Sequence, residues 1–196
     1  ADALLPVIED ILTDCGRRKE DLDAVGVTVG PGSFTGVRIG VATAKGLAWG
    51  LCCRLVGVTS QAAMAAALLM EHTDAELSVP VLDARRGEVF AGVFQRDGAW
   101  VRPLVPAAAL NPDRWWKQIN EAVDDPDLPA YGGDGTPLLL GQGANLRPEL
   151  AGKGEPVLRR WSSAHPATAR ALAAAMNAGG MPNVHPFALL PEYMRV

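Results

Sequence analysis

A glycine-rich loop, between a β-branched run and a helical pattern of small residues, is the part of the sequence best suited to chemistry. It lies in the stretch VGVTVGPGSFTGVRIG, residues 25–40. A loop of this kind in an α/β protein can bind phosphate, because the N–H groups of a helix N-terminus face the anion. Yet Val37 and Arg38 stand where a Walker A loop needs Gly-Lys-Ser/Thr, and the glycines are spaced G-x-G-x-x-x-G rather than as in a dinucleotide fingerprint. A nucleophilic Ser33 would require glycine in place of Pro31.

The other residue types that carry chemistry form weaker patterns. The three histidines, His72, His165 and His185, are far apart and have no second histidine or cysteine at metal-ligand spacing. In the segment DARRGE, residues 83–88, arginines occupy turn positions that would have to be small for backbone amides to reach a phosphate. We therefore expect neither a metal centre nor a nucleotide site formed by this chain alone.

Composition narrows the class of protein further. The 196 residues carry a net charge of -4 and a pI near 5.4, which gives no electrostatic footprint for direct nucleic-acid binding. Of the three cysteines two are adjacent, a placement that ordinary disulfide geometry disfavours. We expect no leader before the first helical pattern, and the apolar runs are shorter than the ~18 residues of a membrane span. We expect a soluble, cytoplasmic protein with reduced thiols that binds no membrane.

The helix that follows the loop, expected from Thr35 to Trp49, is small along one stripe and apolar on most of the remaining surface. The stripe at four-residue spacing comprises Gly36, Gly40, Ala44 and Ala48, and the apolar positions are Val37, Ile39, Val41 and Leu47. Such a helix should be covered on both sides. One cover is its own sheet, and the other is either a lobe of the same chain or a partner protein. Internal packing alone remains an open alternative.

The positions of the remaining elements predict two lobes. Lobe I, residues 1–78, has an amphipathic helix at 1–16, strands at 25–29 and 54–59, and a helix at 60–70 with Ser60 as its N-cap. Lobe II, residues 79–178, begins with a meander of strands at 79–83, 88–96 and 99–102. It continues with a helix from Pro112 capped by Asn111, a strand in TPLLLGQGA and a helix at 166–178. Residues 179–196, rich in proline, should form an extended C-terminal arm.

Four motifs together resemble the TsaB (YeaZ) family, bacterial partners of the enzyme TsaD in making threonylcarbamoyladenosine at position 37 of tRNA. They are GPGSFTGVRIG from residue 30, GVT at 57–59, LDARRGEVFAGVF at 82–94 and PEYMR at 191–195. The loop itself comprises Gly30, Pro31, Gly32, Ser33, Phe34 and Thr35. The family starts with a three-stranded meander, and this chain begins after it.

The resemblance implies an α/β fold of the actin/Hsp70/sugar-kinase (ASKHA) type, with two lobes of mixed sheets flanked by helices. It implies a non-catalytic scaffold subunit that forms a heterodimer with a TsaD-like enzyme, joined by a TsaE-like ATPase, and meets tRNA only through the complex. ATP and metal are expected on the partners, with no cofactor on this chain, and a homodimer through the same surface is plausible. The expected interface residues are Leu4, Ile8, Ile11, Gly36, Arg38, Gly40, Val41 and Ala44.

An enzyme of the same fold is the rival interpretation. It would be an ATP-dependent kinase or a glycoprotease-like (M22) peptidase. Micromolar affinity of the chain alone for ATP would favour the kinase. On the interpretation that we adopt, the glycine-rich loop begins an interface helix and does not hold a phosphate.

Overall fold

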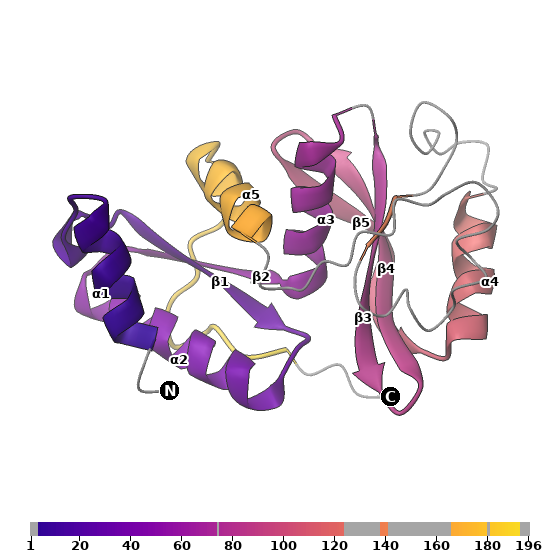
Figure 1. Ribbon diagram of the computed structural model, residues 1–196, viewed down its shortest axis with the longest axis horizontal. Coiled ribbons are helices and arrows are strands. Elements are labelled where there is room, and N and C mark those ends of the chain that lie inside the picture. The colour runs from indigo at the N-terminus through magenta and orange to yellow at the C-terminus, as the bar shows by residue number, and fades with distance from the viewer. Residues whose placement is uncertain (1–3, 74, 124–137, 141–165, 180, 193–196) are drawn as a thin grey trace.

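The chain builds two sheets that lie side by side, with helices between them and outside them (Figure 1). The computed structural model describes residues 4–73, 75–123, 138–140, 166–179 and 181–192. One sheet has two parallel strands, β1 (Ala24–Gly30) and β2 (Arg54–Thr59). The other has four strands in the order β5-β4-β3-β6 and is mixed, because β6 runs parallel to β3 while its other pairs are antiparallel.

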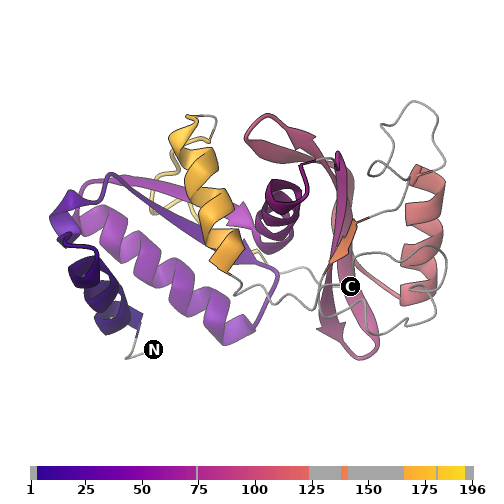
Figure 2. The ribbon, with the colours of Figure 1, turned by 45° about the horizontal axis from the view of Figure 1, so that its top comes forward.

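Lobe I is organised around the two parallel strands. Helix α1 (Leu4–Asp14) and the short 3-10 helix η1 (Lys19–Asp21) precede β1, and α2 (Phe34–Gly50) forms the crossover from β1 to β2 that a parallel pair requires. The side chains of α2 pack on one face of the pair, whereas α5 (Pro166–Asn177) packs on the other (Figure 2). At Gly26 a Cβ atom would stand 2.8 Å from side-chain atoms of α5, so this glycine permits the close packing.

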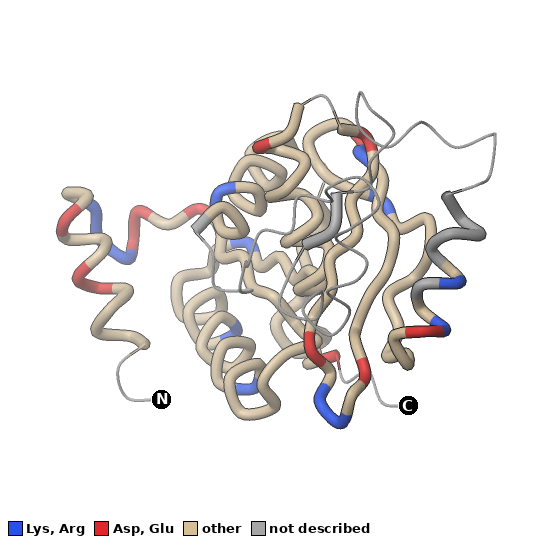
Figure 3. The backbone as a smooth tube through the Cα atoms, turned by 45° about the vertical axis from the view of Figure 1, so that its right-hand side comes forward, with Lys and Arg blue, Asp and Glu red and all other residues tan. Residues whose placement is uncertain are grey.

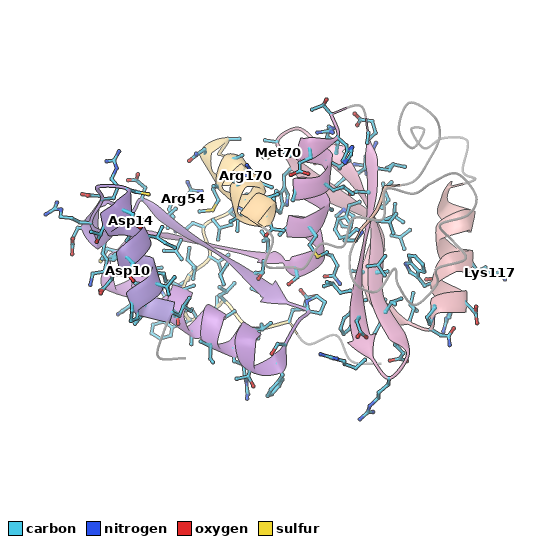
Figure 4. All side chains as sticks on the ribbon, viewed as in Figure 1. Asp10, Asp14, Arg54, Met70, Lys117 and Arg170 are labelled. Atoms are coloured by element: carbon cyan, nitrogen blue, oxygen red, sulfur yellow. The ribbon has the colours of Figure 1, made fainter. Side chains whose placement is uncertain are left out.

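Helix α3 (Ser60–Glu71) lies between the two sheets and is buried on all sides. Nine of its 12 residues are buried, and they share a core with residues of the four-stranded sheet and of α5. A helix that is rich in alanine and apolar at most of its positions suits a place between two layers. Thr59 caps its N-terminus by accepting a hydrogen bond from the Ala62 N–H at 3.1 Å, so the predicted cap, Ser60, is wrong by one residue. At the rim, Arg170 of α5 lies 3.7 Å from Glu71 (Figure 4).

Lobe II is the four-stranded sheet with α3 on one face and α4 on the other. Its elements are β3 (Leu77–Arg85), β4 (Glu88–Asp97), β5 (Trp100–Leu110), α4 (Pro112–Val123) and β6 (Leu138–Leu140). Trp115 of α4 is 3% exposed and packs on the outer face of the sheet. The Asp113 N–H donates to Asn111 Oδ1 at 2.9 Å, which confirms the predicted start of this helix.

Strand β5 is longer than the sequence predicts. The predicted strand ended at Arg102, but the observed strand continues through Pro103 and Pro106 and pairs with β4 as far as Leu110. Proline lacks a donor for a sheet ladder, yet an edge strand tolerates it because one side of that strand bonds to no neighbour. β5 is the edge strand of this sheet, so the prolines do not end it.

The C-terminal segment, residues 181–192, contains no helix and crosses lobe I. The Val184 N–H donates to the Leu55 carbonyl at 2.8 Å, and the Glu192 N–H donates to the Val29 carbonyl at 2.7 Å. Leu189 is 7% exposed and joins the core beneath α2. The predicted extended arm is therefore docked on both strands of lobe I along its described length. The division at residues 78 and 178 stays a prediction, although α5, which it assigns to lobe II, packs on β1 and α3.

We expect Gly57→Ala to destabilise the fold, because the added methyl group would overlap Leu189 Cδ1 and stand 3.1 Å from Val29 Cγ1. Overpacking of this kind costs about 1–3 kcal/mol of unfolding free energy, measurable by urea denaturation. Gly46→Ala is the matched control, because a Cβ at Gly46 meets no atom within 4 Å. A Gly57→Ala protein as stable as the parent would contradict the packing of the C-terminal segment.

Candidate protein interface

The backbone groups of the glycine-rich loop contact other residues of the same chain. The Ser33 hydroxyl accepts the Gly36 N–H at 3.3 Å, and the Ser33 carbonyl accepts the Val37 N–H at 2.8 Å, so the first turn of α2 is capped from within. At Gly30, where φ is +123°, a Cβ atom would overlap the carbonyl oxygen of Glu192. This glycine is thus required by the close approach of the C-terminal segment, and no phosphate is needed to explain it.

One face of α2 belongs to the core of lobe I. Val41, Ala44 and Ala48 are 2%, 5% and 2% exposed and pack with Leu55 and Leu189. The prediction that Val41 and Ala44 contact a partner is therefore wrong. The four-residue stripe drawn from the sequence drifts around a helix of 3.6 residues per turn, so it runs from the exposed surface into the core.

The opposite face of α2 is exposed and carries no charge. It consists of residues that helical geometry places away from the buried positions, and we call it the α2 outer face: Ile39, Ala42, Thr43, Gly46 and Gly50. Ala42, Gly46 and Gly50 are exposed, whereas Ile39 and Thr43 are half-buried.

Packing within the described chain does not explain why three positions of α2 are glycine. A Cβ at Gly40, Gly46 or Gly50 would meet no atom within 4 Å. Glycine inside a helix is about 1 kcal/mol less favourable than alanine, so a helix with several such glycines is weaker than it needs to be for folding. Of the predicted interface residues, Gly36 is exposed and Gly40 is half-buried at the margin of this face, and their contact with a partner stays a prediction.

Sequence reasoning missed the residues at the centre of this surface. The signal that could have found Ala42, Gly46 and Gly50 is the spacing of Val41, Ala44 and Ala48, which marks the inward face. Residues half a turn away from that face must point outward.

Helix α1 exposes the apolar residues predicted for it. Leu4 and Ile11 are 36% and 56% exposed, Ile8 is half-buried, and no residue of α1 is buried. Lys19 Nζ lies 2.7 Å from Glu9 Oε1, a contact that raises the pKa of Lys19 and links α1 to η1. Asp10 and Asp14 are labelled on α1 in Figure 4, and Figure 3 shows this helix standing apart from α2. The structure thus does not join α1 and α2 into one continuous surface.

Aromatic residues flank the C-terminal end of α2. Trp49 is 58% exposed and its ring lies 5.1 Å from that of Phe187, which is 72% exposed, with His185 completing the cluster at 5.5 Å from Phe187. Lys45 Nζ donates to the Leu189 carbonyl at 3.0 Å and holds the C-terminal segment against the helix. This cluster forms only because the segment docks, so the sequence pattern gave no sign of it.

At the other end of α2, Arg38 lies over the ring of Phe34, with 4.4 Å between Cζ and the ring centroid. Both residues are exposed. A cation over an aromatic face is held in a defined orientation. The prediction that Arg38 contacts a partner protein stays a prediction.

The β3–β4 hairpin is held by Asp83. Its Oδ1 accepts the Arg85 N–H at 2.7 Å, the contact by which aspartate side chains commonly cap a turn. Arg85, Arg86 and Gly87 have φ values of +71°, +57° and +81°, the left-handed region that favours glycine. The Arg85 side chain is 88% exposed and its guanidinium is 3.9 Å from Asp83.

The residue types that could bind a metal ion are dispersed over the described part of the chain. No group of three or more His, Cys, Asp or Glu among them could hold a metal ion. His72 and His185 lie apart, at the end of α3 and in the aromatic cluster, while His165 falls outside the described residues. Burial raises the pKa of the Cys53 thiol, which disfavours the reactive thiolate.

A cavity of about 710 Å³ lies between β1 and α5. Its lining includes Thr28 of β1 and Arg54 of β2. In the described part of the chain, no helix has the length and apolar character of a membrane span.

These features define a class of protein: two α/β lobes of the actin/Hsp70/sugar-kinase type, with an exposed and uncharged helix face. Comparison with known proteins agrees. Residues 1–132 match the sequence profile of the family described as TsaD, tRNA N6-adenosine threonylcarbamoyltransferase. The solved structure of YeaZ from Pseudomonas aeruginosa superposes with a TM-score of 0.74 at 28% identity, over 98% of this chain and 84% of that chain.

Two curated relatives carry the name tRNA threonylcarbamoyladenosine biosynthesis protein TsaB. The protein of Bacillus subtilis (strain 168) is 38% identical over 117 residues, 60% of this chain and 50% of that protein. The protein of Escherichia coli (strain K12) is 41% identical over 99 residues, 50% of this chain and 42% of that protein. The chain belongs to the TsaD family, and these relatives place it in the TsaB (YeaZ) group. The match to each of these two relatives spans half or less of that relative's length.

We expect Asp83→Ala to lower the unfolding free energy by about 0.5–1.5 kcal/mol, because the Arg85 N–H loses its acceptor. Asp83→Asn is the control, because its amide oxygen can still accept this hydrogen bond. Urea denaturation of both variants gives the comparison. An alanine variant with parental stability that abolishes tRNA modification in a reconstituted system would show that Asp83 has a chemical role instead.

Proposed function

We propose that this chain is a non-catalytic scaffold subunit of the complex that makes threonylcarbamoyladenosine at position 37 of tRNA. In this proposal the α2 outer face binds a TsaD-type enzyme. The observation that carries it is the uncharged α2 outer face, whose glycines leave open space at the surface. The names of the TsaB relatives supply the pathway.

The chemistry of this surface suits a helix-to-helix contact. Without Cβ atoms, Gly40 and Gly46 let another backbone approach α2 closely, which increases van der Waals contact over the whole face. An uncharged face also avoids the desolvation cost of burying charges that lack partners. Trp49 and Phe187 add exposed aromatic area at one end, the type of residue that often anchors protein interfaces.

The partners would carry the reaction. ATP and metal belong to the TsaD-type enzyme and a TsaE-type ATPase, and this chain supplies binding surface and no cofactor. Its net charge of -4 supports contact with tRNA only through the complex. The complex would act in the cytoplasm, where its tRNA substrate is found. When the enzyme is absent, we expect the chain to form a homodimer through the α2 outer face, because association removes this exposed apolar surface from water.

The rival interpretation is a kinase or an M22-type peptidase. The C-terminal segment lies against Gly30, and arginines occupy the β3–β4 turn, so the backbone positions that would cradle phosphates are already used. No observation on the described residues favours this rival over a scaffold.

We expect Gly40→Leu to weaken binding to the TsaD-type enzyme roughly tenfold or more, a change of about 1.4 kcal/mol or more. The reason is that the new side chain would fill the space that a partner helix needs. Its melting temperature should stay at or above that of the parent, because no neighbouring atom lies within 4 Å of the new Cβ and leucine is a better helix former than glycine. Titration calorimetry and thermal unfolding on one preparation measure both quantities.

Val41→Ala is the matched control for this experiment. Val41 is 2% exposed in the core, so its truncation should lower stability by about 2 kcal/mol while the folded protein keeps its affinity. Unchanged enzyme affinity in a well-folded Gly40→Leu protein would contradict the assignment of this face.

A separate measurement tests the non-catalytic role. We expect protein purified without chelator to hold no stoichiometric zinc, and a nucleotide titration of the chain alone to give no micromolar ATP binding. The expectation rests on the spacing of the histidines and on the loop contacts described above. One tightly held ion per chain, or micromolar ATP affinity, would favour the enzyme interpretation.

A further inference from the structure

The tip of the β3–β4 hairpin places two arginines where the backbone disfavours them. Arg85 and Arg86 have φ values of +71° and +57°, in the region where a side chain crowds its own backbone. Asn-Gly or Gly-Gly would form such a turn with less strain. Backbone strain of this kind points to a use for the side chains that folding does not explain.

The two guanidinium groups are available to an outside partner. Arg85 and Arg86 are exposed, and among the described residues the only acid within ion-pair distance of Arg85 is Asp83, at 3.9 Å. The other carboxylate oxygen of Asp83, Oδ1, already accepts a hydrogen bond from the Arg85 N–H in the turn. Arg86 makes no hydrogen bond or ion pair with any residue that the structure describes.

The hairpin tip projects from the same side of the molecule as the N-terminal end of α2. Figures 1 and 2 show both at the lower edge, and the tip is the blue loop at the bottom of Figure 3. A protein that covers the first turns of α2 would therefore extend toward Arg85 and Arg86.

We propose that Arg85 and Arg86 bind carboxylate groups of the protein that docks on the α2 outer face. This rests on the proposed function, and it adds a charged contact in lobe II to the uncharged one in lobe I. The planar guanidinium forms paired hydrogen bonds with a carboxylate, which sets the orientation of a partner as well as its affinity.

A protein carboxylate fits the hairpin better than an RNA phosphate. Asp83 and Glu88 flank the arginines, so the hairpin has no excess of positive charge, and the whole chain carries -4. Phosphate backbones are bound through accumulated positive charge, whereas a protein contact needs only local pairing.

The test replaces both arginines with glycine, Arg85→Gly and Arg86→Gly together. Glycine removes the charges and relieves the left-handed backbone, so the melting temperature should equal or exceed that of the parent. Surface plasmon resonance against the TsaD-type enzyme should show affinity roughly tenfold lower at low salt. The difference should shrink at about 0.5 M salt, because ions screen exposed charges.

Arg102→Ala is the control for loss of an exposed arginine elsewhere in the same lobe, because Arg102 is exposed on β5. It should bind the enzyme as the parent does. The double variant Arg85→Lys and Arg86→Lys should fall between parent and glycine variant, because charge is kept without the planar fork.

Parental affinity of the glycine variant at low salt would overturn this proposal and leave the α2 outer face untouched, since Gly40→Leu tests that face separately. Unchanged enzyme affinity combined with loss of tRNA binding by the assembled complex would also overturn it, in favour of a phosphate contact. A parent chain that does not bind the enzyme at all would overturn the proposed function, and this proposal with it.

Discussion

The burial of α3 on every side is the constraint on which the arrangement of both lobes depends. Its alanines present a thin surface, so the four-stranded sheet and α5 can approach it closely, and α5 in turn packs on β1. Because one helix contributes to the cores of both lobes, neither sheet can shift far without exposing apolar surface. The lobes therefore share a core, and the positions of α2 and of the β3–β4 hairpin relative to each other follow from it.

The glycines of lobe I divide into two groups by what stands beside them. Gly26, Gly30 and Gly57 are each approached by another part of the same chain, α5 or the C-terminal segment. Gly40 and Gly46 have nothing beside them within 4 Å. The first group explains how the chain packs on itself. The second group has no such explanation, which is why α2 is the part of the molecule best suited to meet another protein.

The C-terminal segment connects these observations. It donates backbone hydrogen bonds to β1 and β2, fills the space left by Gly57 with Leu189, and brings Phe187 to Trp49 at the end of α2. A segment far along the chain from both strands thus completes the core under α2 while leaving the opposite face open. The glycine-rich loop lies at the junction, and its first glycine serves this internal contact.

Much of the fold was readable from local sequence because the signals are local. The β-branched run of β1, the capping residue Asn111 and the Asp83 turn each act over a few residues, and each was confirmed. The length of β5 was not, because proline is tolerated only at an edge, and the strand order that makes β5 an edge is a property of the whole sheet.

The candidate site shows the same division. The sequence by itself determined that α2 is a helix with a stripe of small residues, which includes Gly36 and Gly40, and an apolar remainder. It also determined which motifs relate the chain to its family. Only the tertiary structure decided which face is inward, burying Val41 and Ala44 and exposing Gly46. The tertiary structure also brings Trp49, His185 and Phe187 together in the aromatic cluster. The physical reason is that burial depends on contacts between segments far apart in the chain, and no periodicity along one helix encodes them.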